Sequence, residues 1–367
     1  MISVRHDMFP CGPILRILTR LSSKIIISLI RESVKSKGNI MFFRLENWRP
    51  ALLACLILSI PSAQNNGLSG QEPAKDRSPS GQNLPARISD QTYRVRVDLV
   101  NLLCSAFDKD TNTFVTTLTR NDFTIYEDGR QQEIENFVRE TNLPLTLAML
   151  IDTSQSVAPK LQFEQEAATS FFQSILREND RAMLVSFDSG VTLLQDFTND
   201  PNKLTGEINK LKAAGGTALY DAIYRSCDEK MIRETGRKAI IILSDGEDES
   251  SRWNYDQAME LALRAESAIF AISVSKGGFF GVGGSSEGDS VLKDMAEQTG
   301  GRIFYPFKVE ELVEAFRQIN QELRSQYNIG YLSSNPASDG KYRKIEIKVR
   351  EKGLKLNYRK GYYAPNS

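Results

Sequence analysis

Hydrophobic and polar positions follow two different patterns along this chain. Between residues 144 and 326, nearly continuous apolar runs alternate with segments whose apolar residues recur at helical spacing. The runs Leu145–Ile151, Ala239–Leu243 and Ile269–Val274 are typical of strands that are covered on both faces. Strand–helix alternation of this kind predicts an α/β fold with a mostly parallel, doubly wound, Rossmann-like sheet.

Two further segments complete the prediction for this α/β part. Met183–Phe187 is a short apolar run, and Val191–Phe197 follows after only a few residues, so we expect the second to be an antiparallel neighbour of the first. The last helix is expected over Val309–Gln326, where apolar residues form one stripe.

The flanks of the α/β part, residues 89–143 and 327–367, alternate apolar and polar positions as half-buried strands do. In the first flank, every second residue from Tyr93 to Leu99 is apolar, which predicts that Leu99 faces inward. Neither flank alone carries enough strands for a stable sheet pair. We therefore expect the two flanks to pair into one small β-sandwich-like domain.

A hairpin is expected within the first flank. Asp128-Gly129 separates the run Phe123–Tyr126 from a second apolar-dotted run that extends through Phe137. Both central positions of a tight hairpin turn need positive φ, and an Asp-Gly pair supplies them readily.

The N-terminal region predicts export. Residues 41–63 have a positive start, an apolar centre and small residues at the end, which is the layout of a secretory signal peptide. Residues 1–40 do not have the pattern of a folded element, so we expect translation to start at Met41. Residues 64–88 are rich in Gly, Ser, Pro, Gln and Asn and predict a disordered linker. The protein is expected to be secreted or periplasmic, or alternatively anchored to the membrane through residues 41–63.

Composition excludes several functions. Lysine plus arginine and aspartate plus glutamate each number 46, so the chain lacks the net positive charge of a general nucleic-acid binder. The single histidine, His6, excludes histidine-based triads and histidine-rich zinc sites. Cys104 and Cys227 fall in different expected domains, which predicts two separate buried thiols rather than a disulfide.

Three polar segments are expected at the carboxyl edge of the sheet, where ligands of such folds bind: the first is Asp152–Ser156, the second Gly215–Thr217 and the third Ser244–Gly246. Their oxygen-bearing side chains are Asp152, Ser154, Ser156, Thr217 and Asp245. Two carboxylates and three hydroxyls form an oxygen-only set that suits a hard dication, so Mg²⁺ is the expected cofactor, with Mn²⁺ or Ca²⁺ as alternatives. Because carboxylates are few in this set and hydroxyls bring no charge, we expect incomplete charge neutralisation, and the ion would keep waters that a partner's carboxylate can displace.

Each of these residues also has a purely structural interpretation. Ser154 and Ser156 could cap a helix near Pro159, and Thr217 could cap the helix that opens at Ala218. Asp245 begins an acidic run that is often no more than a solvated surface.

Together the three segments resemble the metal-ion-dependent adhesion site of von Willebrand factor type A domains. The resemblance covers residues 144–326, and the segments occur in the family's order. It implies that Ser154, Ser156 and Thr217 touch the metal directly, while Asp152 and Asp245 act partly through water. The flanking hairpin and the Tyr-Asn-Ile-Gly-Tyr strand further resemble a secreted subgroup of this family in Acidobacteria.

Candidate partner contacts surround the expected metal site. They are Glu247, Trp253, Phe279 and Phe280. The glycine-rich loop that carries the two phenylalanines lacks a complete Gly-x-Gly-x-x-Gly motif after the first strand, so nucleotide binding is not expected.

Three functions remain open from the sequence. The first is a non-enzymatic, adhesion-type module that binds a protein ligand through a Mg²⁺-bridged carboxylate. The second is a structural or assembly protein with an unused metal site. The third is a Mg²⁺-dependent phosphohydrolase resembling the haloacid dehalogenases, although Ser154 stands where those enzymes have a second aspartate.

Overall fold

The computed structural model describes residues 99–140, 143–275 and 286–366. All of these lie in one compact unit, Asp90–Ser367. The predictions for residues 1–40, 41–63 and 64–88 fall outside the described ranges, as do Phe279 and Phe280. None of the helices within those ranges has the length and hydrophobicity that a membrane span requires.

A six-stranded sheet forms the centre of the α/β part, in the order β10-β9-β8-β5-β6-β7. Its strands are β5 (Leu145–Asp152), β6 (Arg181–Phe187), β7 (Val191–Thr198), β8 (Arg237–Ser244), β9 (Ser267–Ser273) and β10 (Ile303–Phe304). β7 runs antiparallel to β6, and the other neighbouring pairs are parallel. The mostly parallel, doubly wound sheet is therefore confirmed.

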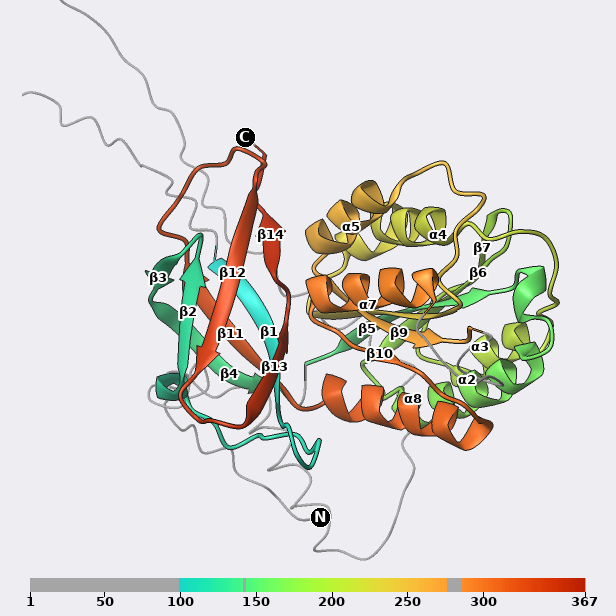
Figure 1. Cartoon of the computed structure of the whole chain (residues 1–367), viewed down its shortest axis with the longest axis horizontal. Coiled ribbons are helices and arrows are strands. Elements are labelled where there is room, and N and C mark those ends of the chain that lie inside the picture. The colour runs from blue at the N-terminus through green and yellow to red at the C-terminus, as the bar shows by residue number, and fades with distance from the viewer. Residues whose placement is uncertain (1–98, 141–142, 276–285, 367) are drawn as a thin grey trace, which may run out of the picture. The chain divides into compact units, whose positions relative to one another are not determined.

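Helices cover both faces of this sheet (Figure 1). One face carries α2 (Leu161–Ile175), α3 (Pro201–Ile208) and α8 (Val309–Leu323), and the other carries α4 (Leu219–Arg225), α5 (Tyr255–Arg264) and α7 (Glu287–Thr299). β5, β8 and β9 are buried along their whole length because helices shield them on both sides.

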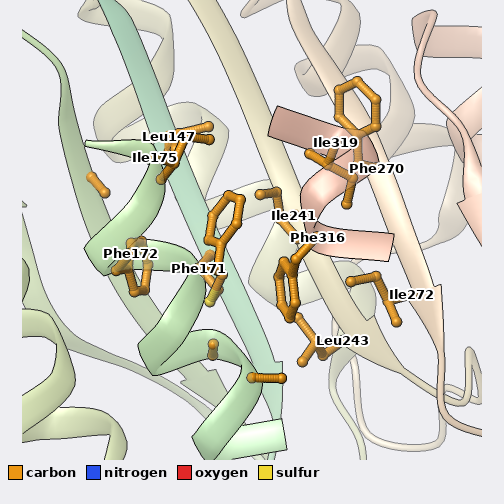
Figure 2. Close-up of a cluster of buried hydrophobic side chains, with 14 of the residues drawn as sticks. Leu147, Phe171, Phe172, Ile175, Ile241, Leu243, Phe270, Ile272, Phe316 and Ile319 are labelled. Atoms are coloured by element: carbon orange, nitrogen blue, oxygen red, sulfur yellow. The ribbon is translucent and has the colours of Figure 1, made fainter. Parts of the chain in front are cut away.

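Aliphatic and aromatic side chains together fill the core between the sheet and the helices α2 and α8 (Figure 2). Phe171 of α2 and Phe316 of α8 lie with ring centroids 4.7 Å apart. They pack over Leu147, Ile241 and Phe270 of the central strands. Each such side chain contributes roughly 1.5–3 kcal/mol by leaving water, so hydrophobic burial fixes the helices on the sheet.

The two flanks form a β-sandwich of two four-stranded sheets, as predicted. One sheet has the order β13-β1-β11-β4 and the other the order β14-β12-β2-β3. Their bounds are β1 (Leu99–Asp108), β2 (Phe123–Glu127), β3 (Arg130–Gln132), β4 (Ile134–Glu140), β11 (Gln326–Leu332), β12 (Tyr342–Val349), β13 (Leu354–Tyr358) and β14 (Gly361–Tyr363). Strands from opposite ends of the chain pair in both sheets, for example Leu102 with Ile329 and Ile125 with Ile347.

The Asp-Gly hairpin is present. Glu127 pairs with Arg130, which leaves Asp128 and Gly129 as the two turn residues. Their φ angles are 47° and 80°, so both adopt the left-handed conformation that the sequence indicated.

Two local predictions are wrong. Leu99 is 38% exposed, whereas Val100 and Leu102 face the sandwich core, so the inward phase of β1 is shifted by one residue. The last helix ends at Leu323 rather than at Gln326, because Gln326 already begins β11 and pairs with β4. In both places, pairing with distant strands overrides the local pattern.

Both thiols are buried and free, as predicted. Desolvation raises the pKa of Cys104 and the pKa of Cys227 to about 12.

The sandwich is bonded to helices on both faces of the central sheet. Glu322 of α8 accepts a hydrogen bond from Asn357 Nδ2 of β13 at 2.7 Å and pairs with Arg302 at 3.0 Å. On the other face, Lys360 N donates to Gln298 O of α7 at 2.9 Å. Burial of Glu322 raises its pKa, and Arg302 opposes that effect. These polar contacts connect the two parts of the described chain.

Asp180 joins three elements of the α/β part. Its carboxylate accepts hydrogen bonds from Leu145 N at 2.9 Å and Arg177 N at 3.0 Å, and it forms an ion pair with Arg324. Burial alone would raise the pKa of Asp180, but the hydrogen bonds from Arg324, Leu145 and Arg177 outweigh it and lower the pKa. A lowered pKa adds stability above the pKa of the unfolded chain, and that stability is lost as the pH falls through the folded value.

We expect Asp180→Asn to lower the free energy of unfolding by about 3 kcal/mol at pH 7, because Arg324 would stay buried without its counter-charge. The exposed neighbour Glu178 supplies the control, and Glu178→Gln should change that free energy by less than about 0.5 kcal/mol. Urea unfolding measures both. The difference in unfolding free energy between wild type and Asp180→Asn should become smaller at acid pH. An equal difference at neutral and acid pH would contradict a stabilising role for the ionised Asp180 carboxylate.

Candidate metal centre

Asp152 is the last residue of β5 and is fully buried. Its Oδ1 accepts from Ser154 N at 2.8 Å, and its Oδ2 accepts from Ser244 Oγ at 2.7 Å. Desolvation raises the pKa of Asp152 to about 6, against hydrogen bonds from Ser154 and Ser244 that lower it, while Asp245 raises it further. The carboxylate is thus fixed in orientation and destabilised as an anion, which favours a nearby cation.

A chain of side-chain oxygens connects the first and third polar segments. Ser154 Oγ lies 3.0 Å from Ser156 Oγ, and Ser156 Oγ donates to Asp245 Oδ2 at 2.8 Å. Ser154 is buried and Ser156 is half-buried. The structure therefore brings four of the five expected ligand residues together, including two that are 93 positions apart (Asp152 and Asp245).

The loop that carries Thr217 is joined to the same place through its backbone. Gln155 N donates to Gly215 O at 3.1 Å, and Ala214 N donates to Thr153 O at 2.7 Å. Gly215 has a φ of 75°, a conformation that favours glycine.

Thr217 itself is 5% exposed. Its carbonyl oxygen accepts from Glu249 N and Ser250 N, at 3.0 and 2.9 Å. Its hydroxyl makes no hydrogen bond with any described residue. Thr217 thus fixes the loop that follows Asp245 through its backbone and keeps its side-chain oxygen available.

The capping interpretations are not observed. Ser154 occupies the N-cap of a 3-10 turn, yet its side chain makes no capping hydrogen bond. The N-cap of α4 is Ala218, and the backbone amide of Tyr220, in the first turn of the helix, donates to Asp248 Oδ2 at 3.0 Å. The hydroxyls of Ser154 and Thr217 therefore do not cap the N-termini of helices.

The oxygen spacing fits a small dication. Neighbouring ligands of an octahedral ion with bonds of 2.0–2.1 Å lie about 2.9 Å apart. The separations of 3.0 Å between the two serine hydroxyls and 2.8 Å from Ser156 to Asp245 are ordinary hydrogen-bond lengths that also lie close to that edge length, so these oxygens could face one ion with little movement. The donors are oxygen only, so the residues present fit Mg²⁺ better than a soft metal.

Sequence reasoning missed two supporting features. Ser244 is fully buried, and its hydroxyl both donates to Asp152 and accepts from Gly246 N at 3.0 Å. A Cβ on Gly246 would lie 2.3 Å from Gly288 O, so the first turn of α7 packs directly on the Asp245 loop. The small residues on either side of Asp245 were the available signal for both features.

The expected partner contacts have mixed placements. Glu247 is exposed. Trp253 is 36% exposed and stacks on Tyr224 of α4, with ring centroids 4.0 Å apart and planes 5° from parallel. Asp248, which the sequence placed with the solvated acidic run, instead accepts from Tyr220 N and Ser251 Oγ. It therefore stabilises the start of α4.

Comparisons with known proteins found relatives of low sequence identity. An uncharacterized protein of Borreliella burgdorferi is 25% identical over 211 residues, which cover 53% of this chain and 57% of that protein. The chain thus spans little more than half the length of that relative.

Two solved structures are similar at low identity. A von Willebrand factor type A structure from Catenulispora acidiphila has a TM-score of 0.41 and 15% identity, covering 68% of this chain and 76% of that one. The vWF domain of the type V pili tip protein Mfa5 from Porphyromonas gingivalis has a TM-score of 0.40 and 16% identity, covering 50% of this chain and 95% of that one. Residues 147–247, which lie within the α/β part of this chain, match the family model described as the von Willebrand factor type A domain.

Proposed function

We propose that this protein is a non-enzymatic binding module that holds Mg²⁺ and recognises a carboxylate of a protein ligand. The residues proposed to hold the ion are Asp152, Ser154, Ser156, Thr217 and Asp245. The observation that carries the proposal is the oxygen chain from Ser154 through Ser156 to Asp245 at octahedral edge spacing. The bound ion would present a positive charge with an open coordination position, and a carboxylate of the ligand could occupy that position.

The hydrogen bonds support different roles for the ligand residues. Asp152 has one oxygen engaged by Ser154 N and the other by Ser244 Oγ, so it would act on the ion through water. The unpartnered Thr217 hydroxyl and the Ser154 hydroxyl have lone pairs free for direct coordination.

The surroundings of the ion would determine specificity. Exposed Glu247 and the stacked pair of Trp253 and Tyr224 belong to the loop after Asp245 and to helix α4. A flat aromatic pair and an acidic side chain, if both contact the ligand, favour a partner segment with an apolar group and a basic group near its carboxylate.

A secreted or periplasmic location is part of the proposal. It rests on the signal-like pattern of residues 41–63, with membrane anchoring through the same residues as the alternative. The finer resemblance to the secreted subgroup from Acidobacteria stays a prediction.

Metal binding is the first test. Titration calorimetry should show one Mg²⁺ or Mn²⁺ site in the wild type. Asp152→Asn and Thr217→Val should abolish it, because the first removes a negative charge beside the ion and the second removes a hydroxyl that would coordinate it. Thr217→Val keeps the shape of the side chain, and Thr117→Val, at an exposed position of the sandwich, is the matched control. Mg²⁺ at 100 times its Kd should raise the unfolding free energy of wild type by about 2.7 kcal/mol. Absence of any metal affinity would favour the structural or assembly alternative.

Partner capture tests the carboxylate. Protein captured from a cell-envelope extract by the wild type should be released by a chelator and should be absent with Thr217→Val as bait. Amidation of the carboxyl groups of the captured protein should also prevent its rebinding. Capture that survives both the chelator and the amidation would contradict recognition through a metal-bridged carboxylate.

Turnover separates the module from a hydrolase. A Mg²⁺-dependent phosphohydrolase of the dehalogenase type would need a carboxylate in place of Ser154, so we expect no release of p-nitrophenol from p-nitrophenyl phosphate. Asp152→Asn measures the background. Wild-type turnover that exceeds this background and depends on Mg²⁺ would overturn the non-enzymatic proposal.

A further inference from the structure

Helix α2 carries a carboxyl group where its pattern calls for an apolar residue. Leu161, Glu164, Ala168 and Phe171 lie at helical spacing on the stripe that faces the sheet, and all four are buried. Glu164 is 1% exposed, and neither of its carboxyl oxygens has a hydrogen-bond partner.

Such a group is unfavourable unless a charge compensates it. Burial without hydrogen bonds destabilises an anion, and a leucine or methionine at this position would pack without that loss. Desolvation accordingly raises the pKa of Glu164 to about 8. The helix therefore holds a carboxyl group that packing alone does not explain.

The charges that act on Glu164 are those of the proposed metal centre. Asp152 and Asp245 both raise its pKa, and Lys160 lowers it. Lys160 is itself buried, and its ammonium donates to Val274 O at the end of β9. Glu164 thus lies within electrostatic range of both carboxylates of the centre, one helical turn after the loop that carries Ser154 and Ser156.

The sum of these buried charges matches one dication. Three carboxylates and one ammonium give −3 + 1 = −2 when all are ionised. No three acidic, histidine or cysteine side chains among the described residues lie close enough to hold an ion together, so Glu164 is not placed as a direct ligand.

We propose that Glu164 is an outer carboxylate of the metal centre, which strengthens cation binding by its charge from beneath the ligand loops without touching the ion. This inference rests on the proposed metal site and adds to it a residue outside the three polar segments. It makes Glu164 a positioning residue that acts through Asp152 and Asp245.

Glu164→Gln tests the inference, because it keeps the size of the side chain and removes the charge. Loss of an outer partner of a metal site weakens affinity by about 10- to 100-fold, and we expect a rise of that size in the Kd for Mg²⁺ by calorimetry on the full chain. Glu166→Gln, at an exposed position of the same helix, is the matched control and should bind as wild type does.

Thermal unfolding supplies a readout that a merely structural role would not give. Without metal and at pH 9, above the pKa of about 8, Glu164→Gln and Glu164→Met should unfold at a higher temperature than wild type, since each removes a buried charge that has no hydrogen-bond partner. With Mg²⁺, both variants should gain less stability than wild type gains. A lower melting temperature without metal, or misfolding of both variants seen by circular dichroism, would overturn the inference.

The outcomes distinguish this inference from the proposed function. If wild type binds Mg²⁺ and Glu164→Gln binds it with unchanged Kd, only the role of Glu164 fails. If wild type binds neither Mg²⁺ nor Mn²⁺, the metal site fails and the role of Glu164 fails with it.

Discussion

The structure depends on one constraint at the end of β5, where a fully buried strand terminates in a carboxylate. Asp152 cannot reach bulk water, so its oxygens must be stabilised from within the protein. The parallel register that pairs Ile151 with Leu243 places Ser244 of β8 beside it, and the backbone turn supplies Ser154 N. Ser154 and Ser244, which carry the neighbouring hydroxyls, are therefore held beside Asp152.

The choice of hydroxyls over further carboxylates has a physical consequence. A third acid in direct reach would neutralise a dication more completely and reduce its attraction for an outside anion. In the proposed centre, Ser154, Ser156 and Thr217 would coordinate the ion without adding charge, whereas Glu164 would add charge without touching it. Affinity for the ion and the open coordination position for a ligand would then come from different residues.

Features that depend on local periodicity could be predicted from the sequence. Features that depend on pairing with distant segments could not. The buried strands, the antiparallel β7 and the Asp128-Gly129 turn carry their signals within a few residues, and the structure has them. The phase of β1 at Leu99 depends on partners more than 200 positions away, at Leu332. Glu164 was missed because a stripe of apolar residues defines the helix, and one polar residue within that stripe gives no functional signal by itself. Its role is suggested only when the folded chain shows that the charges of Asp152 and Asp245 act on it.

The sandwich lies at the amino ends of the central-sheet strands, and the candidate metal site lies at their carboxyl ends. This arrangement follows from where the chain passes between the two parts. β4 and β11, which precede and follow the α/β part, are paired neighbours at Glu140 and Gln326, so the chain leaves and re-enters the sandwich at one place. β5 begins there and ends at Asp152, eight residues or about 25 Å along. An α/β domain inserted in this way is held at the amino ends of its strands, so the oxygen chain at the carboxyl edge lies away from the connections to the sandwich.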